Sequence, residues 1–132
     1  MTRRNYFIPE VALSHDGSVA LAHWYLDRLA DLGCTRVKFQ HHLSTVEAWQ
    51  SWRTPYASPP APFVESRPGY LTRTAFSNET WLSLRQHAHA RGLKLGSSVF
   101  CPEAVAQQKD GRLDRAPTAG CPQSARRIVA IR

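Results

Sequence analysis

The sequence of 132 residues has few cysteines and no long apolar run, and each shortage excludes a class of protein. Its three cysteines, Cys34, Cys101 and Cys121, are an odd number without a CxxC pair, which argues against a disulfide framework or a zinc knuckle. No stretch approaches the ~18 apolar residues of a membrane span. The N-terminal segment 1–5 is basic, but the apolar core of a signal peptide does not follow it. We therefore expect a cytoplasmic protein without a membrane partner.

The short motifs of self-contained catalytic sites are also missing. The sequence has no GxGxxG pattern and no P-loop, and none of its six histidines stands in an HxxxH or HExxH spacing. A metal site built by this chain alone is therefore not predicted. The composition, with 42% hydrophobic and 20% charged residues, is that of a folded protein, and the length suits one domain.

The net charge of +7 suits a small anionic substrate better than nucleic acid. Three of the seven net charges come from Arg126, Arg127 and Arg132, in a basic tail over residues 121–132 that has no acid. The other basic residues are scattered among acids, whereas nucleic-acid binding needs a basic patch. Nucleic acid is therefore an unfavoured partner.

Hydrophobic periodicity predicts alternating strands and helices. Residues 7–14 are expected to form a strand, Ser18 to cap a helix that ends at Gly33, and residues 35–40 to form a second strand. A unit of this length implies parallel strands joined by a right-handed crossover.

Residues 41–76 interrupt this alternation. They contain five prolines interspersed with aromatic residues and show no clear periodicity, which is typical of a long functional loop or of a disordered insertion. Regular structure resumes with a helix that Ser77 caps and that runs through Arg91. A third strand over residues 93–100 follows.

Two further elements are expected beyond this strand. A helix should begin at Pro102 and end at Gly111. A fourth strand begins at Leu113 and is soon interrupted by Pro117. The pattern predicts three βα units and this doubtful fourth strand.

Strand alternation divides the predicted strands into an apolar and a polar face. In the second strand, Val37 and Phe39 would face a helix layer, while Lys38 and Gln40 would point the other way. The first strand divides likewise, so Glu10 lies on the polar face. Its helix-facing residues would be Phe7, Pro9, Val11 and Leu13.

A charged side chain inside a sheet needs a partner. Glu10 and Lys38 therefore either form a structural ion pair or bind a ligand. Ser98, beside Gly96, occupies the carboxyl end of the third strand, the end where α/β sheets and barrels place their active sites. We expect Glu10, Lys38 and Ser98 to cluster at one end of a parallel sheet, with Gln40 near them.

The histidines are weaker candidates for binding. His15, in the first βα turn, is the best placed of them. His41 and His42 directly follow the second strand, where loop histidines are expected to be solvated. His87 and His89 fall in the last turn of a helix, where capping is expected.

The same segments carry a resemblance to a known family. The segment Pro9-Glu-Val-Ala-Leu-Ser-His-Asp-Gly17 resembles the opening strand and turn of the sialic acid (N-acetylneuraminate) synthase family. Val37-Lys-Phe-Gln40 matches the family's second strand, and Leu95-Gly-Ser-Ser-Val-Phe100 resembles its third. Residues 67–77 are similar to the stretch that leads to its second helix. Four such motifs occur in the family's order over residues 7–108.

The resemblance implies a fold and a reaction. The fold is a partial (β/α) TIM barrel over residues 1–120, and the reaction condenses phosphoenolpyruvate with N-acetylmannosamine or a related N-acetylated sugar. By position, Lys38 and Ser98 would contact phosphoenolpyruvate, while the catalytic residues Glu10 and Gln40 would face the sugar and a metal-bound water. The family uses a divalent metal, Mn or Mg, whose ligands belong to parts that this chain lacks.

The chain also departs from the family. Ala12, Ser14 and Val99 replace a usual glycine, asparagine and proline, and no resemblance extends past Gly120. A whole barrel needs about 250 residues. We therefore expect a truncated chain that is inactive alone and self-associates through open sheet edges. The alternative is a non-catalytic small α/β module that binds a small anion or a partner protein.

Overall fold

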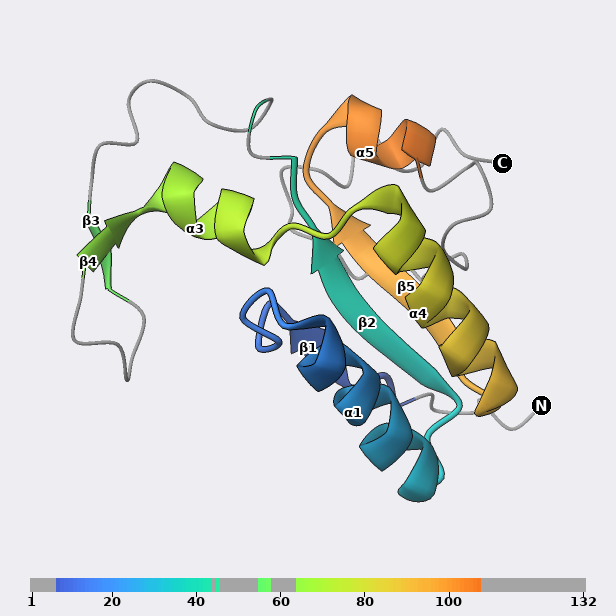
Figure 1. The fold of residues 1–132 in the computed structure, drawn as a ribbon. Helices are drawn as coiled ribbons and strands as arrows, with labels where there is room; N and C mark the ends of the chain where they lie inside the picture. The colour runs from blue at the N-terminus through green and yellow to red at the C-terminus, as the bar shows by residue number, and fades with distance from the viewer. Residues whose placement is uncertain (1–6, 44, 46–54, 58–63, 108–132) are drawn as a thin grey trace.

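Three parallel strands organise the molecule, in the order β1-β2-β5. They are β1 (Glu10–Ala12), β2 (Arg36–His41) and β5 (Lys94–Val99). The structure is a computed structural model, and it describes residues 7–43, 45, 55–57 and 64–107 (Figure 1). The predicted α/β class and the parallel sheet built from βα units are confirmed.

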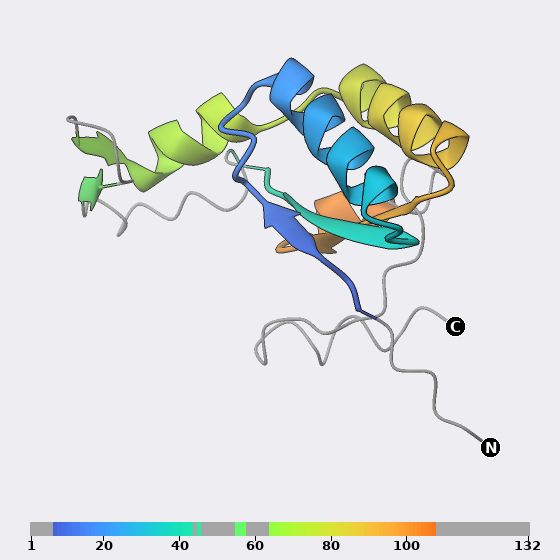
Figure 2. The ribbon, with the colours of Figure 1, turned by 90° about the horizontal axis from the view of Figure 1, so that it is seen from below.

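Helices α1 (Val19–Asp31) and α4 (Asn78–Ala90) cover one face of this sheet (Figure 2). Each helix begins where the sequence predicted, because Ser18 and Ser77 accept hydrogen bonds from the backbone N–H groups of Leu21 and Thr80. Gly33 follows the last residues of α1 with a φ of 78°, a left-handed conformation that glycine adopts without strain. The predicted helix boundaries are therefore confirmed at these positions.

The core lies between the sheet and these two helices. Val37, Phe39 and Leu95 point from the strands into a cluster with Leu26 of α1 and Trp81 of α4, and all five side chains are buried. The predicted helix-facing side of β2 is therefore confirmed. Burial of this apolar surface fixes which face of the sheet remains for polar side chains.

The first strand is shorter than predicted. A register shift between Glu10 and Ala12 and a positive φ of 53° at Ala12 end the pairing with β2. The N–H of Ser14 then bonds to the carbonyl of Val11 at 2.9 Å, so the chain turns where a strand was expected. Phe7 was placed on the helix side, but it precedes the strand and is 78% exposed.

The described residues between 41 and 76 include regular elements, where the composition predicted a long functional loop or a disordered insertion. They contain β3 (Pro55–Ala57), β4 (Val64–Ser66) and α3 (Arg67–Thr74), and β3 and β4 pair in antiparallel fashion. Pro68 fits in the first turn of α3 because its missing N–H has no helical partner there. In Figure 1, α3 runs between this small ribbon and the rest of the fold.

The final described element is α5 (Pro102–Gln107), which begins at the predicted proline. The predicted helix end at Gly111, the fourth strand and the basic tail lie outside the described residues. Within the described part of the chain, no helix has both the length and the apolar character that a membrane span requires.

Candidate functional site

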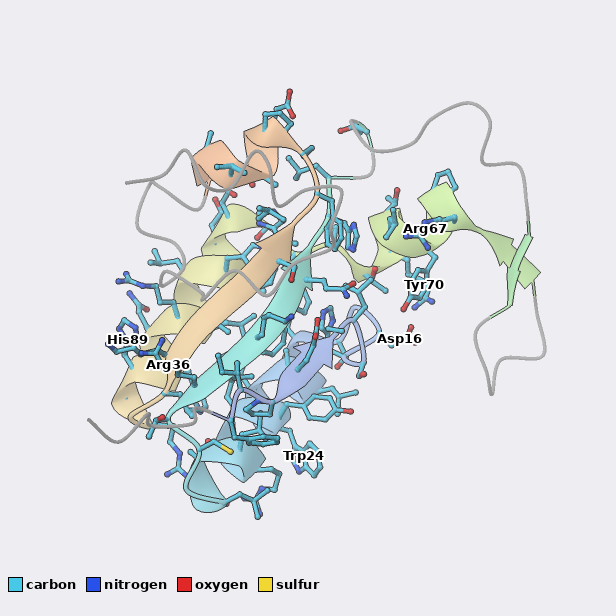
Figure 3. All side chains as sticks on the ribbon, turned by 180° about the vertical axis from the view of Figure 1, so that it is seen from behind. Asp16, Trp24, Arg36, Arg67, Tyr70 and His89 are labelled. Atoms are coloured by element: carbon cyan, nitrogen blue, oxygen red, sulfur yellow. The ribbon has the colours of Figure 1, made fainter. Side chains whose placement is uncertain are left out.

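A charged pair occupies the middle of the sheet on the face opposite α1 and α4. Lys38 is in register with Glu10 on one side and with Gly96 on the other. The Nζ of Lys38 lies 2.9 Å from a carboxylate oxygen of Glu10. The Lys38 side chain is 16% exposed and that of Glu10 is 40% exposed, so solvent or a ligand can reach both groups. Figure 3 views the molecule from behind, with the strands in front of the two helices.

The second pair of predicted residues lies one step nearer the carboxyl ends of the strands. Gln40 of β2 is in register with Ser98 of β5, and both are half-buried. Alternate residues of a strand share a face and stand about 7 Å apart. The structure therefore brings Glu10, Lys38, Gln40 and Ser98 onto one polar face, which we call the four-residue face.

His42 lies beside the four-residue face, although its position after the second strand predicted a solvated side chain. It is 4% exposed, and its ring stacks on Phe100 with centroids 4.1 Å apart and planes 9° apart. Its Nε2 lies 3.2 Å from Oε1 of Gln40. The expectation of a solvated histidine is wrong, because an aromatic ring from the end of β5 covers the imidazole.

His41 was also expected to be solvated, and it too is buried. It belongs to β2, and its ring lies 5.2 Å from that of Trp81 in α4. The helix-facing positions Val37 and Phe39 continue to residue 41 at the same spacing of two. Extending the alternation by one step would therefore have found this burial.

His15 lies in the core beneath the turn after β1. It is fully buried, with its ring stacked on Phe76 at 4.2 Å and on Phe39 at 5.8 Å. The N–H of Gly17 donates to Nδ1 of His15 at 3.1 Å. Burial lowers the pKa of His15 to about 4, although the nearby charge of Asp16 acts in the opposite direction. His15 is thus neutral near pH 7 and belongs to the helix side of the sheet.

The first βα turn and α3 meet at the carboxyl end of the sheet. Arg73 donates to the side chain and to the carbonyl of Asp16, at 2.7 and 3.1 Å. The guanidinium of Arg73 also lies 5.4 Å from the ring centre of Tyr70. Figure 3 shows Tyr70 of α3 near Asp16. These contacts hold α3, which lies between β2 and α4 in the sequence, against the first βα turn. Both lie at the carboxyl end of the sheet, near the last residues of the four-residue face.

A second polar cluster joins the two covering helices. The Nδ1 atoms of His23 and His87 lie 2.8 Å apart, and Nε2 of His87 lies 2.8 Å from Asp27. Burial, and next the charge of His87, lowers the pKa of His23, whereas the hydrogen bond from His87 lowers the pKa of Asp27. His87 therefore bonds across to α1 rather than only capping its own helix. The cluster lies between the helices, away from the four-residue face.

The divalent metal that the family resemblance implies finds no set of ligands in the described part of the chain. No group of three or more His, Cys, Asp or Glu side chains there could hold a metal ion. The described residues therefore do not fit such an ion.

Comparison with solved structures shows what fold this chain shares. No protein-family model and no curated protein matches the chain. The structure is similar to that of N-acetylneuraminic acid (sialic acid) synthetase from Leptospira borgpetersenii serovar Hardjo-bovis in complex with citrate. The TM-score is 0.64 at 18% identity, and the match covers 78% of this chain and 32% of the synthetase chain. The chain therefore spans about a third of that enzyme's length and shares the fold of that part.

Proposed function

We propose that this chain carries the phosphoenolpyruvate-binding part of a sialic acid (nonulosonic acid) synthase site. Lys38 and Ser98 bind phosphoenolpyruvate, and Glu10 and Gln40 face the sugar, N-acetylmannosamine or a related N-acetylated sugar. The observation that carries the proposal is the register that sets Lys38 beside Glu10, and Gln40 beside Ser98, on one polar face. The fold likeness to a sialic acid synthetase supports it.

The chemistry of Lys38 suits an anion. Its ammonium group has three N–H donors, and the contact with Glu10 at 2.9 Å uses one of them. The others can donate to carboxylate or phosphate oxygens of a ligand. Gly96, next to Lys38 in register, has no side chain to block its approach. The Ser98 hydroxyl adds a neutral donor nearer the carboxyl ends of the strands.

The proposed reaction joins the enol carbon of phosphoenolpyruvate to the aldehyde carbon of the sugar. Water adds to the carbon that carries the phosphate, and the C–O bond to inorganic phosphate breaks. Glu10, 40% exposed, is placed to accept a hydrogen bond from a sugar hydroxyl. The proposed role of the four residues is thus to bind and orient the two substrates.

A calorimetric titration with phosphoenolpyruvate tests the binding. The wild-type chain should bind it, and Lys38→Ala should weaken binding about ten-fold or more, because a charge-assisted hydrogen bond is worth roughly 1.5–3 kcal/mol. Lys94→Ala is the matched control, since it removes the same charge from the exposed amino end of β5. Equal binding by wild type and Lys38→Ala, or no binding at all, would contradict the proposal.

A phosphate-release assay separates the synthase from the alternative of a non-catalytic anion-binding module. With phosphoenolpyruvate, N-acetylmannosamine and manganese, we expect the 132-residue chain to release no more phosphate than Lys38→Ala. The reason is that transition-state stabilisation requires a complete, water-excluded site. Turnover above this control would show that the chain is active alone. Binding of phosphoenolpyruvate with no effect of the sugar on its affinity would favour the non-catalytic module.

A further inference from the structure

The amide oxygen of Gln40 contacts a buried imidazole, that of His42. His42 is 4% exposed and lies flat against Phe100, which fixes the plane of its ring. Its Nε2 meets Oε1 of Gln40 at 3.2 Å. Because an amide oxygen only accepts hydrogen bonds, Nε2 of His42 is the donor in this contact.

We propose that His42 is a positioning residue that turns the NH2 group of Gln40 toward the bound ligand. With Oε1 occupied by His42, the amide offers its donors to the polar face. The inference rests on the proposed function and extends the role of Gln40 in it. Gln40 faces the sugar there, and here its NH2 group also donates to phosphoenolpyruvate, beside Lys38 and Ser98. His42 itself acts through Gln40 and does not touch the ligand.

A fixed amide determines which ligand the face prefers. Lys38 presents N–H donors, and Gln40 presents donors two residues further along the same strand, about 7 Å away. The Ser98 hydroxyl stands in register with Gln40 and adds a third donor position. The donors thus stand at two points, Lys38 at one and Gln40 with Ser98 at the other. This spacing favours a small ligand that carries two oxyanion groups over a ligand that carries one. Phosphoenolpyruvate, with a carboxylate and a phosphate, has this chemistry, and inorganic phosphate does not.

The first test needs no ligand and uses NMR on the 15N-labelled full chain. The imidazole pattern of His42 should show the proton on Nε2, and the Gln40 side-chain NH2 should be ordered. His42→Phe keeps an aromatic ring against Phe100 but removes the donor, so the order parameter of the Gln40 NH2 should fall. The thermal midpoint and the backbone order at Gln40 should stay as in the wild type. His89→Phe, on an exposed part of α4 (Figure 3), is the control and should leave the Gln40 amide unchanged.

The second test measures selectivity by titrating phosphoenolpyruvate and inorganic phosphate separately. His42→Phe should weaken phosphoenolpyruvate binding roughly ten-fold, the loss expected for a hydrogen bond to a charged group. Its affinity for phosphate should stay within about two-fold, so the preference for the two-group anion shrinks. His42→Gln, whose longer amide can donate from near the position of Nε2, should restore part of both the order and the preference.

The outcomes separate the two proposals. An equally ordered Gln40 amide in His42→Phe, or a proton on Nδ1 of His42, would overturn the positioning role. If the variant does not fold, the tautomer in the wild type and the order of Gln40 in His42→Gln decide the same question. If the amide loosens as expected but the wild type does not bind phosphoenolpyruvate, the positioning role stands and the proposed ligand is wrong.

Discussion

His15 is a titratable side chain that the fold keeps away from water, between Phe39 and Phe76. Its pKa is about 4 in the folded chain, against an ordinary value of 6.5. Between these two values the unfolded chain binds more protons than the folded chain, so the free energy of unfolding falls as the pH drops. Above pH 6.5 both states are neutral at this position, and the effect disappears.

We therefore predict that acid destabilises the chain through His15 before most carboxylates titrate. The loss attributable to this side chain should reach about 2 kcal/mol at pH 5 relative to pH 7.5. His15→Phe keeps an aromatic ring and removes the titration, so its unfolding free energy should depend less on pH. Urea unfolding at pH 7.5 and at pH 5 measures the difference, with His89→Gln as the control. If the unfolding free energy changes equally between pH 7.5 and pH 5 in the wild type and in His15→Phe, the prediction is wrong.

Single-residue features were predictable where they depend on alternation along a strand. Lys38 and Glu10 could be assigned to a shared face because Val37 and Val11 define the other side. The burial of His42 could not be predicted, because it depends on Phe100, which follows a strand more than fifty residues later. Contacts between segments far apart in sequence leave no periodic signal within either segment.

At the scale of elements, the packing of α3 on the first βα turn depends on a glycine. Gly17 has a φ of 82°, and a Cβ added to it would lie 2.4 Å from the carbonyl oxygen of Arg73. Any larger residue would push α3 away from the turn and weaken the ion pair between Asp16 and Arg73. The sequence could not reveal this role, because α3 lies in a proline-rich stretch that lacked helical periodicity.

Gly17→Ala should accordingly destabilise the chain more than a matched substitution does. Gly33→Ala is the match, since Gly33 has a φ of 78° and nothing lies within 4 Å of its added Cβ. A left-handed alanine costs about 1–2 kcal/mol at either site. Gly17→Ala should cost at least a further ~1 kcal/mol, as overpacking typically does. Chemical unfolding of both variants measures the two costs, and equal costs would show that the turn and α3 do not pack this closely.

For the whole molecule, the sheet explains both the success and the limit of the sequence predictions. The βα order, the caps at Ser18 and Ser77 and the parallel pairing follow from local patterns, and the structure confirms them. The β3–β4 ribbon does not follow from such patterns, because short strands among prolines lack the length that periodicity requires. The roles of the four-residue face remain predictions, since register places side chains but does not identify a ligand.

The edges of the sheet lead to a last prediction, on association. In the described part of the chain, β1 and β5 each pair with one neighbour, so each has an outer edge able to pair with another chain. Phe7, directly before β1, adds an apolar side chain that is 78% exposed. We therefore expect the purified chain to form dimers or larger species.

Sedimentation velocity over a range of concentrations tests this expectation with a matched pair of variants. Phe7→Lys places a charge beside the β1 edge and should shift the distribution toward monomer. Leu32→Lys should not, because Leu32 is equally exposed but follows the end of α1. A compact monomer at every concentration, with a sharp cooperative transition near ~60 °C as in ordinary mesophilic domains, would contradict open edges. Such a chain would be a self-contained α/β module, and the polar face would then be complete without further strands.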